Sequence, residues 1–598
     1  MIVLGINEDH NATAALIKDG EVIACSSEER FSRVKNDSEY PFKAINSILE
    51  STGITPEQID AIAFATETID AIQLRTKRIT RYSISDYVKE MHEHWRKVLY
   101  ENKSSTFWED LLNDGRFNKP NENYYDYSYM DKMPQELWQQ LASEERKNTV
   151  HRHLSISKEK IKAIDHHTSH AYYAYFASPY SVSQKATIIT ADGWGDGCNA
   201  TISIVEKGKI KEIHRTGMCH LARIYRWITL LLGMKPNEHE YKVMGLAAYA
   251  QDYVRDPAYA ILKETLVVDG IDFRWKNKPT DMYFYFQEKF EGLRFDGIAA
   301  GLQLWLEDML SDWVTNVMKH TKTDILYFSG GLAMNVKANK VIAELPVIKK
   351  LYVSPSGGDE SLAIGAAYVA AKNAGDTPRT LQNAYLGYAP TVEEANVSAR
   401  PFRSDSAFNV IDNPDNEFIA DLLANGKVLG RCVGKMEFGA RALGNRSILC
   451  NPSNFDNLRI INEKIKFRDF WMPFTPSILF ERGNDYLVNP KQLDAYYMAL
   501  AFDSTSMAKN HIKAAMHPYD FSIRAQLVKQ EMNPEYYALI KAFEQKTGIG
   551  ALLNTSLNLH GSPIVCNAED AIETLVKSGL DGMLLPGILI IKKESILK

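Results

Sequence analysis

The sequence has no CxxC pair, because its six cysteines are scattered along 598 residues. This spacing excludes a zinc ribbon or a disulfide framework and predicts free thiols. The sequence also has no uninterrupted apolar run of 18 or more residues, and no charged-then-apolar leader precedes the first predicted strand. We therefore expect a cytoplasmic protein with no membrane span.

An excess of positive charge is also missing, since the formal net charge is −6. No general attraction to nucleic acid or to anionic membranes is expected, and no segment specifies an oligomeric state. A hydrophobic content of 45% and a charged content of 24% are typical of a folded globular protein. The chain is too long for one core, so we expect several domains that merge into two large α/β units.

A three-strand pattern occurs twice. Three β-rich segments open the chain, IVLGIN, TAALIKDG and EVIACSSEE, and Asp19-Gly20 reads as a hairpin turn between the last two. The pattern returns as ATIITADG, ATISIVEKG and KIKEIHRT, with Lys207-Gly208 as a turn. A repeated three-strand unit followed by helices predicts the duplicated actin/hexokinase-like fold, which binds nucleotide between its halves. Residues 75–160, rich in Tyr, Trp, Glu, Asn and Lys, are predicted to be a helical insertion that covers a site.

The segment from Asp165 to Asp196 carries two candidate metal ligands. Asp165 is the predicted N-cap of a helix that runs through Ala177, and Pro179 is expected to prevent its continuation. His166 and His170 lie one turn apart on one face of this helix, whereas His167 points elsewhere. An isolated H-x-x-x-H is more often two ordinary polar residues, so the pattern needs further ligands to indicate a metal.

Two aspartates are candidates for these further metal ligands. Asp192 is predicted at the end of the strand 186–190, and Asp359 lies in the loop between the strand KKLYVSPS and the next helix. Two imidazoles and two carboxylates from two halves of a fold would make a mixed nitrogen and oxygen site that suits Fe²⁺, Mn²⁺ or Zn²⁺.

Glycines mark a second candidate site in the same half. DILYFSGGLAMNVKAN predicts a strand, a double-glycine turn and a helix, so the N–H groups of Gly330 and Gly331 would face a phosphate or the edge of a nucleotide. In NEHEYKVMGLAAYA, Gly245 and its small neighbours permit close approach of a ligand or another helix. A double-glycine turn is weak evidence by itself, because most are only tight turns.

The C-terminal part has a basic cluster. A linker containing Pro378, Pro390 and Pro401 precedes it, and residues 427–482 contain ten basic side chains against five acidic ones. The cluster centres on GARALGNRS and KIKFRDFWMPFTPS, followed by HPYDFSIR and LLNTSLNLHGSPIV. A guanidinium group can donate two parallel hydrogen bonds to phosphate oxygens, so this cluster indicates an anion site. A nucleic-acid site would need interleaved exposed aromatics and a basic chain.

In their order along the chain, these motifs resemble the O-carbamoyltransferases of the NodU/CmcH/TobZ family. The resemblance covers nearly the whole sequence and is carried by LGINEDHNATAALIKDG, EERFSRVK, DHHTSHA, ADGWGD, YKVMGLAAY, SGGLAMN, SGGDESLAIGAA and FGARALGNRSIL. It implies an α/β protein with an actin-like carbamoyl-transfer domain (residues 1–380, with a metal site and the helical insertion at about 75–160) and a YrdC-like domain (385–598).

The resemblance also implies the reaction. The YrdC-like domain would make carbamoyl-adenylate from carbamoyl phosphate and ATP, with Mg²⁺ accompanying ATP. The actin-like domain would then transfer the carbamoyl group to a hydroxyl of a small-molecule natural product. His10 would deprotonate that hydroxyl, and Lys35 would contact the adenylate.

Further site residues are implied by the same resemblance. The metal, with Fe²⁺ favoured over Mn²⁺ and Zn²⁺, would be bound by His166, His170, Asp192 and Asp359. The nucleotide in the first domain would be bound by Lys242, Gly245, Gly330, Gly331 and Asn335. Carbamoyl phosphate and ATP in the second domain would be bound by Arg441, Arg446, Lys466, Arg468, Arg524, Asn554 and Ser556.

Two other functions remain compatible with parts of the sequence. A fusion enzyme that makes threonylcarbamoyl-adenosine on tRNA would need a basic surface, against which the net charge of −6 speaks. An actin-like ATPase that acts as a binding or chaperone module would have no need of a second anion site. The acceptor alcohol has no recognisable signature in the sequence.

Overall fold

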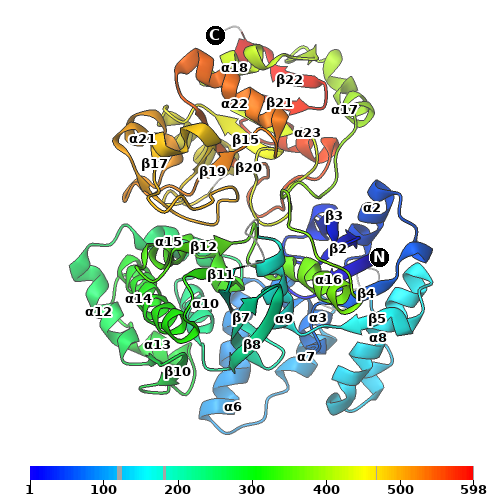
Figure 1. Ribbon diagram of the computed structural model, residues 1–598, viewed down its shortest axis with the longest axis vertical. Coiled ribbons are helices and arrows are strands. Elements are labelled where there is room, and N and C mark those ends of the chain that lie inside the picture. The colour runs from blue at the N-terminus through cyan, green and yellow to red at the C-terminus, as the bar shows by residue number, and fades with distance from the viewer. Residues whose placement is uncertain (117–123, 179–183, 467, 597–598) are drawn as a thin grey trace. The chain divides into compact units, whose positions relative to one another are not determined.

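A computed structural model describes residues 1–116, 124–178, 184–466 and 468–596. The chain divides into two compact units, Met1–Leu381 and Gln382–Lys598, and both are built from α-helices and mixed β-sheets (Figure 1). The six cysteines are buried and unpaired, as their spacing predicts. Within the described ranges, no helix combines the length and apolar character needed to cross a membrane.

The first unit contains two sheets of five strands. The N-terminal sheet has the order β3-β2-β1-β4-β5, with β1 Ile2–Asn7, β2 Thr13–Lys18, β3 Glu21–Ser27, β4 Ala61–Phe64 and β5 Ile161–Ala163. The second sheet has the order β12-β11-β6-β7-β8, with β6 Ala186–Gly195, β7 Cys198–Glu206, β8 Lys209–Thr216, β11 Ile325–Ser329 and β12 Lys350–Val353. In both sheets an antiparallel meander is extended by two parallel strands beside its first strand. The duplication predicted from the sequence is therefore confirmed at the level of strand order.

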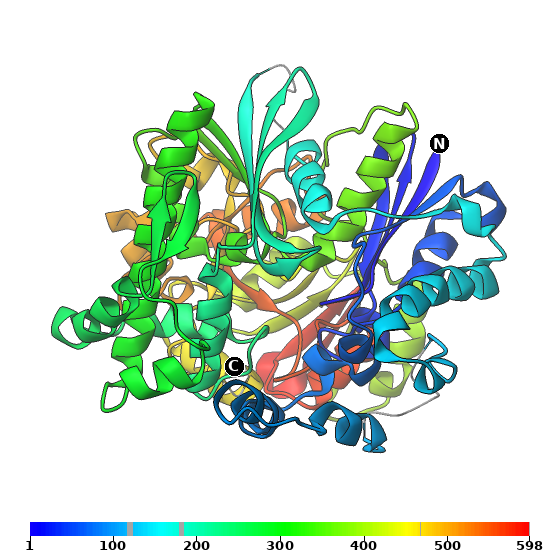
Figure 2. The same ribbon diagram turned by 90° about the horizontal axis from the view of Figure 1, so that it is seen from below.

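Two helices lie between these sheets and bring the halves together (Figure 2). They are α9 His166–Phe176 and α16 Leu362–Asn373. A Cβ atom at Gly5 of β1 would lie 1.8 Å from the carbonyl oxygen of Ala363, and one at Gly365 would lie 2.0 Å from that of Ser169. Glycine at these two positions is what allows α16 to contact both β1 and α9 backbone to backbone.

Helices also cover the outer edges of the first unit. Those of the predicted insertion are α3 Ala71–Thr76, α4 Arg78–Arg81, α5 Ile84–Glu90, α6 Arg96–Tyr100, α7 Phe107–Asn113 and α8 Trp138–Leu154. Those that follow the second meander are α10 Leu221–Leu231, α11 Glu240–Ala247, α12 Asp252–Lys263, α14 Phe295–Thr321 and α15 Val336–Glu344. Among the described residues between β4 and β5, every regular element is helical, as predicted.

The insertion is attached to the end of β1 through buried charges. Arg146 of α8 donates from Nε to Oε1 of Glu8 over 2.8 Å, and the Tyr125 hydroxyl also contacts this carboxylate. Tyr127 and Trp138 belong to the same apolar core as the strands of the N-terminal sheet. The aromatics of the insertion are thus mainly core residues, and the insertion fixes the loop that follows β1.

The second unit is built on one sheet of eight strands in the order β13-β22-β21-β14-β15-β20-β16-β19. Its strands are β13 Phe408–Asp412, β14 Leu429–Cys432, β15 Arg446–Cys450, β16 Thr475–Leu479, β19 Gln526–Val528, β20 Ala551–Ser556, β21 Gly582–Leu585 and β22 Ile588–Lys592. Its longer helices are α17 Val392–Ala399, α18 Asn416–Ala424, α22 Pro534–Thr547 and α23 Ala568–Val576. The segments of the basic cluster meet around β15, β16, β19 and β20.

Candidate active site

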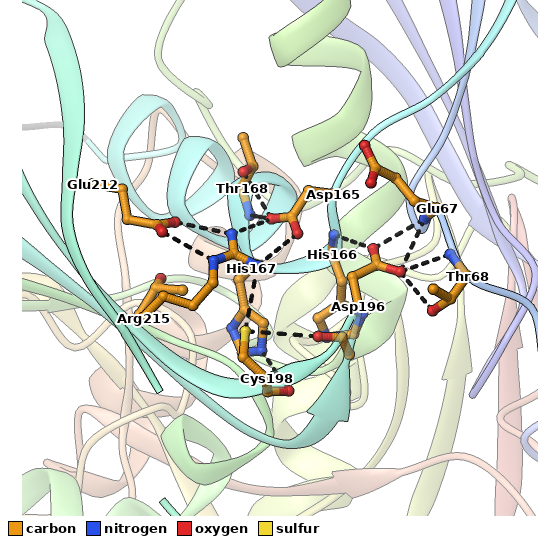
Figure 3. A network of polar contacts seen from close by, with 12 residues as sticks. Glu67, Thr68, Asp165, His166, His167, Thr168, Asp196, Cys198, Glu212 and Arg215 are labelled. Atoms are coloured by element: carbon orange, nitrogen blue, oxygen red, sulfur yellow. Dashed lines mark hydrogen bonds and ion pairs between the residues drawn. The ribbon is translucent and has the colours of Figure 1, made fainter. Parts of the chain in front are cut away.

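The histidine helix starts at a network of polar contacts (Figure 3). Asp165 caps α9 by accepting a hydrogen bond from the Thr168 N–H (2.7 Å), and it pairs with Arg215 of β8 (2.8 Å). Asp196, in the turn after β6, accepts from the backbone N–H groups of His166 and Thr68, each over 2.7 Å. The start of α9 is thereby fixed to both halves of the first unit. Pro179, which is expected to stop this helix, lies outside the described residues.

His166 and His170 lie on the same face of α9, whereas His167 is turned away. The Nδ1 atom of His167 is 2.7 Å from the Thr190 hydroxyl. Burial, reinforced by its two neighbouring histidines, lowers the pKa of His167 to about 3, so its ring is neutral. This side chain supports the helix and is unavailable as a ligand.

The four predicted metal ligands meet at one point. The Nε2 atom of His170 is 3.2 Å from Oδ2 of Asp192 and 3.5 Å from Oδ1 of Asp359. The Nε2 atom of His166 is 3.5 Å and 4.0 Å from the same two oxygens. One ligand atom from each residue lies within 4.8 Å of all the others. Ligands about 2.1 Å from a shared ion would stand roughly 3–4 Å apart, so these donors have the right mutual spacing.

Asp192 reaches this point from within a strand, not from its end. The predicted strand stopped before Asp192, but β6 continues to Gly195. The parallel ladder with β11 ends at Thr190, and the pairing with β7 shifts between Ala191 and Gly195. A bulge therefore turns the carboxylate out of the regular ladder. Gly195 is required here, since a Cβ atom would lie 2.3 Å from the His166 ring.

The environment of the cluster fits a cation. His166 Nε2 is buried and has no hydrogen-bond partner, so this nitrogen fits a role as a metal ligand. The His170 Nδ1 atom is 3.3 Å from the hydroxyl of Ser329, so its Nε2 atom is oriented towards the carboxylates. Burial opposes ionisation of both carboxyls, yet the two neighbouring histidines hold the pKa of Asp192 well below its usual value. The pKa of Asp359 is raised, by burial and then by the Asp192 charge.

His10 lies in the loop between β1 and β2, close to this cluster. Its Nε2 atom is buried without a hydrogen-bond partner, while its carbonyl accepts from the Asn7 amide (3.1 Å). The neighbouring Asp9 accepts from Gln73 (3.1 Å). Burial raises the pKa of Asp9, and the charges of His10 and His166 partly oppose this, so Asp9 lies near both histidines. Asp9 was missed in the sequence, where only its position beside His10 could have marked it.

Lys35 is fixed by an acidic side chain that the sequence did not single out. Its ammonium lies 2.8 Å from Glu238, which also pairs with Lys235 over 2.8 Å. Burial opposes the negative charge of Glu238, but Lys35 and Lys235 lower its pKa to about 2. Glu238 precedes α11, the helix that carries the predicted nucleotide residues Lys242 and Gly245.

The double-glycine turn differs from its prediction. The helix after Gly330 is a 3₁₀ turn, Gly331–Met334, and the α-helix begins only after Asn335. The Gly330 N–H donates to the Gly357 carbonyl (3.0 Å), so it does not face a phosphate. Gly330 has a φ of 97°, and a Cβ atom there would lie 2.2 Å from the Ala191 carbonyl oxygen. Its role is to let the turn pack against β6, and a Cβ at Gly331 would likewise lie 2.9 Å from Oδ1 of Asp192.

Asn335 also differs from its prediction as a nucleotide ligand. Its side-chain oxygen accepts from the Ala338 N–H (3.0 Å) and its amide group donates to Gln303 (2.9 Å). The side chain is therefore used to cap α15 and to join it to α14. Capping by an internal asparagine satisfies the same polar atoms that a ligand would need.

In the second unit, Arg524 lies near enough to Arg441 and Arg468 for their charges to lower its pKa. Burial lowers the pKa of Arg524 well below its usual value, and the charges of Arg441 and Arg468 lower it further. The Arg524 Nε atom is buried without a hydrogen-bond partner. Arg468 is oriented by Asn462 (2.9 Å) and by the ring of Phe474 (4.1 Å from ring centre to Cζ). Like charges held together in a partly buried place predict an anionic ligand.

Arg446, which was predicted to bind an anion, donates most of its N–H groups to backbone carbonyls. It is fully buried, and its guanidinium donates to the carbonyl oxygens of Cys566 (3.0 Å), Tyr388 (2.9 Å) and Gly434 (3.1 Å). These hydrogen bonds to backbone carbonyls hold the loops around β15 together. An arginine within a glycine-rich motif looks the same in sequence whether it faces a ligand or a set of carbonyls.

The remaining predicted residues of this unit line the end of β20. The Lys466 ammonium lies 3.1 Å from the Ser556 hydroxyl, and it also contacts Asn558. Asn554 is buried, donates to the Ser477 hydroxyl (2.9 Å), and leaves its Oδ1 atom without a partner. Asn558 was not singled out in the sequence, although it belongs to the same motif.

Comparisons with known proteins show the family of this chain. Residues 2–368 match the family model described as carbamoyltransferase N-terminus, and residues 420–592 match the model described as carbamoyltransferase C-terminus. An uncharacterized protein of Methanocaldococcus jannaschii is 30% identical over 99% of this chain and 100% of its own length.

Two named relatives are more distant or partial. Nodulation protein NolNO of Sinorhizobium fredii is 28% identical over 98% of this chain and 79% of its own. The 3'-hydroxymethylcephem-O-carbamoyltransferase of Amycolatopsis lactamdurans is 28% identical over 44% of this chain and 47% of its own. With both family models matched in order, the resemblance found in the sequence is confirmed: the chain is a transferase that belongs to the carbamoyltransferase family.

Proposed function

We propose that this enzyme is an O-carbamoyltransferase that works in two steps at two sites. In the second unit, which we assign a YrdC-like fold, carbamoyl phosphate and ATP give carbamoyl-adenylate. In the first unit, which we assign an actin/hexokinase-like fold, the carbamoyl group passes to a hydroxyl of a small-molecule acceptor and AMP leaves. The observation that carries the proposal is that the four metal-type ligands gather in one unit and the three arginines in the other.

The arginine cluster supports the first step. Carbamoyl phosphate and ATP are both polyanions, and bringing them into register requires positive charge. Arg441, Arg468 and Arg524 supply it, and Lys466 lies beside Ser556, which ends β20 of the same unit. Release of phosphate and pyrophosphate with formation of carbamoyl-adenylate consumes one water, so the atoms balance. Mg²⁺ would accompany ATP as its usual counter-ion.

The cluster of two histidines and two aspartates supports the second step. A divalent ion held by His166, His170, Asp192 and Asp359 would act as a Lewis acid that polarises the carbamoyl carbonyl and neutralises the phosphate of the leaving AMP. The mixed nitrogen and oxygen donor set suits Fe²⁺, Mn²⁺ and Zn²⁺ alike, and iron is proposed first because of the resemblance to the family. Lys35, held by Glu238, would bind the adenylate.

His10 would take the proton of the acceptor hydroxyl as that oxygen attacks the carbamoyl carbon. Its Nε2 atom is buried and carries no hydrogen bond within the protein, so it is available to a substrate. The acidic side chain of Asp9 lies next to it and would favour the imidazolium that forms. The proton leaves with His10, the new O–C bond forms, and the bond to AMP breaks.

The alternative of a tRNA-modifying enzyme that makes threonylcarbamoyl-adenosine predicts other substrates, bicarbonate and threonine. It is less favoured because the chain has a net charge of −6. An actin-like binding module is excluded by the family, since the chain is a transferase.

Exchange of labelled pyrophosphate into ATP tests the proposal. We expect exchange that depends on carbamoyl phosphate and not on threonine. Arg524→Ala should abolish it, whereas Arg459→Ala should not, because Arg459 is exposed and pairs with Glu463 (3.1 Å) on the surface of the same unit. Exchange that persists in Arg524→Ala, or that requires threonine, would contradict the proposal.

A further inference from the structure

Next to the metal-type cluster, an indole ring is exposed to solvent. Trp194 is 52% exposed, which is unusual for the largest apolar side chain. It follows Asp192 by two residues, a distance of about 7 Å along a strand. The ring lies over Gly217, where a Cβ atom would be 3.5 Å from ring atoms of Trp194. A flat apolar surface therefore begins within one side chain's reach of the candidate transfer centre.

A cation without a counter-charge lies against this ring. The Cζ atom of Arg223, from α10, is 5.7 Å from the centre of the Trp194 ring. Within the described part of the chain, Arg223 has no ion pair with a carboxylate. Burial lowers the pKa of Arg223, and no neighbouring acid opposes this effect. A partly buried guanidinium that is not neutralised by the protein is suited to an anion supplied from outside.

Next to Arg223 lie a second aromatic surface and a further polar atom without a hydrogen-bond partner. His220 stacks on Trp275 with ring centres 4.8 Å apart, and its buried Nδ1 atom has no hydrogen-bond partner. Burial, followed by the charges of Arg223 and the exposed Lys278, lowers the pKa of His220 to about 4, so at neutral pH its ring is an uncharged hydrogen-bonding group.

We propose that Trp194 and Arg223 form the acceptor-binding surface of this enzyme, and that the acceptor is a ring-bearing alcohol with an anionic group such as a carboxylate, sulfate or phosphate. The ring of the acceptor packs on the indole, and the anionic group is bound by Arg223 with His220 as an additional hydrogen-bonding partner. This arrangement brings a hydroxyl of the acceptor towards His10 and the cluster around Asp192. The inference rests on the proposed function, to which it adds the class of acceptor.

Two matched probes test the charge preference. Phenyl β-D-glucuronide and phenyl β-D-glucoside present the same aromatic ring and sugar ring, and only the first is an anion. In isothermal titration of the full-length protein, we expect the glucuronide to bind about 10- to 100-fold more tightly, the range expected for one hydrogen-bonded ion pair. Arg223→Gln should remove this preference and Arg223→Lys should retain part of it. Trp194→Ala should weaken both probes equally.

The control is Arg274→Gln. Arg274 is 61% exposed, adjoins Trp275 and pairs with Asp269, so removing its charge should leave the preference unchanged. Equal binding of the two probes, binding of neither, or a preference that survives Arg223→Gln would overturn the proposal. Weaker binding of AMP by Arg223→Gln with no effect on the glucuronide would also overturn it, because Arg223 would then bind the adenylate.

The carbamoyl phosphate-dependent exchange of pyrophosphate into ATP separates this inference from the proposed function. If the wild-type protein shows no exchange, the two-step function fails. If it shows exchange but does not distinguish the two probes, only the assignment of an anionic acceptor fails.

Discussion

The candidate sites of the two units treat buried charge in opposite ways. In the first unit, the buried charges around the candidate transfer site have opposite partners, as in Glu8–Arg146 and Lys35–Glu238, and the two aspartates face two histidines. In the second unit, the buried Arg524 has the like charges of Arg441 and Arg468 near it. A balanced cluster can form before its ligand arrives and then hold a small cation in fixed geometry, whereas a cluster of like charges is stabilised by the anions that it binds. This contrast suits a metal-assisted transfer in one unit and a reaction between polyanions in the other.

The largest effect is expected from removing a member of the balanced cluster. Loss of an outer partner of a metal ligand costs about 10- to 100-fold in affinity, and loss of the ligand itself costs more. His170→Ala should therefore lose the metal and reduce carbamoyl transfer by more than about 100-fold. Elemental analysis of the purified variant, compared with Arg274→Gln, measures the first effect. A full complement of metal in His170→Ala would show that the four side chains are not its ligands.

Breaking a buried pair in the first unit should mainly affect stability. Arg146→Ala leaves the Glu8 carboxylate buried without its partner, which costs about 3–5 kcal/mol in the free energy of unfolding. Water should not readily replace the lost guanidinium, because the Arg146 side chain is only 3% exposed and the Tyr125 hydroxyl covers the same carboxylate. Urea unfolding monitors the change, and Arg459→Ala provides a surface control. If the free energy of unfolding falls by less than about 1 kcal/mol, as expected for an exposed ion pair, the Glu8–Arg146 pair is not buried as described.

Removing a positive charge from the arginine cluster of the second unit should not destabilise the unliganded protein. Arg524→Gln relieves repulsion from two other guanidiniums, so we expect the unfolding temperature of the free protein to stay the same or rise by a few degrees. Inorganic phosphate at 100 times its dissociation constant should stabilise the wild type by about 2.7 kcal/mol and the variant much less. Thermal unfolding with and without phosphate measures both. Equal stabilisation of the two proteins would show that Arg524 does not bind the anion.

A smaller effect is expected where a carboxylate only positions a cation. Glu238→Gln keeps the shape of Glu238 but removes the charge that orients Lys35, so nucleotide binding in the first unit should weaken by about 10-fold. Because Lys35 and Lys235 lower the pKa of Glu238 to about 2, the pair is intact at pH values above the ordinary glutamate pKa and is lost only as the pH falls towards 2. The wild-type affinity should therefore not change between pH 6 and 8 through Glu238. A Glu238→Asp variant that restores part of the affinity would support positioning, and unchanged binding in Glu238→Gln would exclude it.

Helix periodicity and strand order were sufficient to predict the gathering of His166, His170, Asp192 and Asp359. The strand pattern placed Asp192 at the end of one strand and Asp359 in the loop after another, and the i, i+4 spacing placed both histidines on one face. The bulge that turns Asp192 out of its ladder was not predicted, because it depends on pairing between strands that are distant in sequence.

Some predicted ligand residues have partners within the fold. Arg446, Asn335 and the Gly330 N–H were predicted to bind ligands, and their polar atoms contact backbone carbonyls, a helix end and a neighbouring turn. Sequence shows which donors and acceptors are present but not which of them the fold satisfies internally. Asp9 and Glu238 were missed for the converse reason, since their importance comes only from the partners that folding brings to them.

The division of the reaction between the two units can be measured directly in one variant. His170→Ala, given carbamoyl phosphate, ATP, Mg²⁺ and an acceptor alcohol, can be assayed at the same time for released pyrophosphate and for carbamoylated product. We predict release of pyrophosphate at a rate close to that of the wild type, with no product formed. Loss of pyrophosphate release together with product would contradict the account, because it would show that both steps depend on the cluster in the first unit.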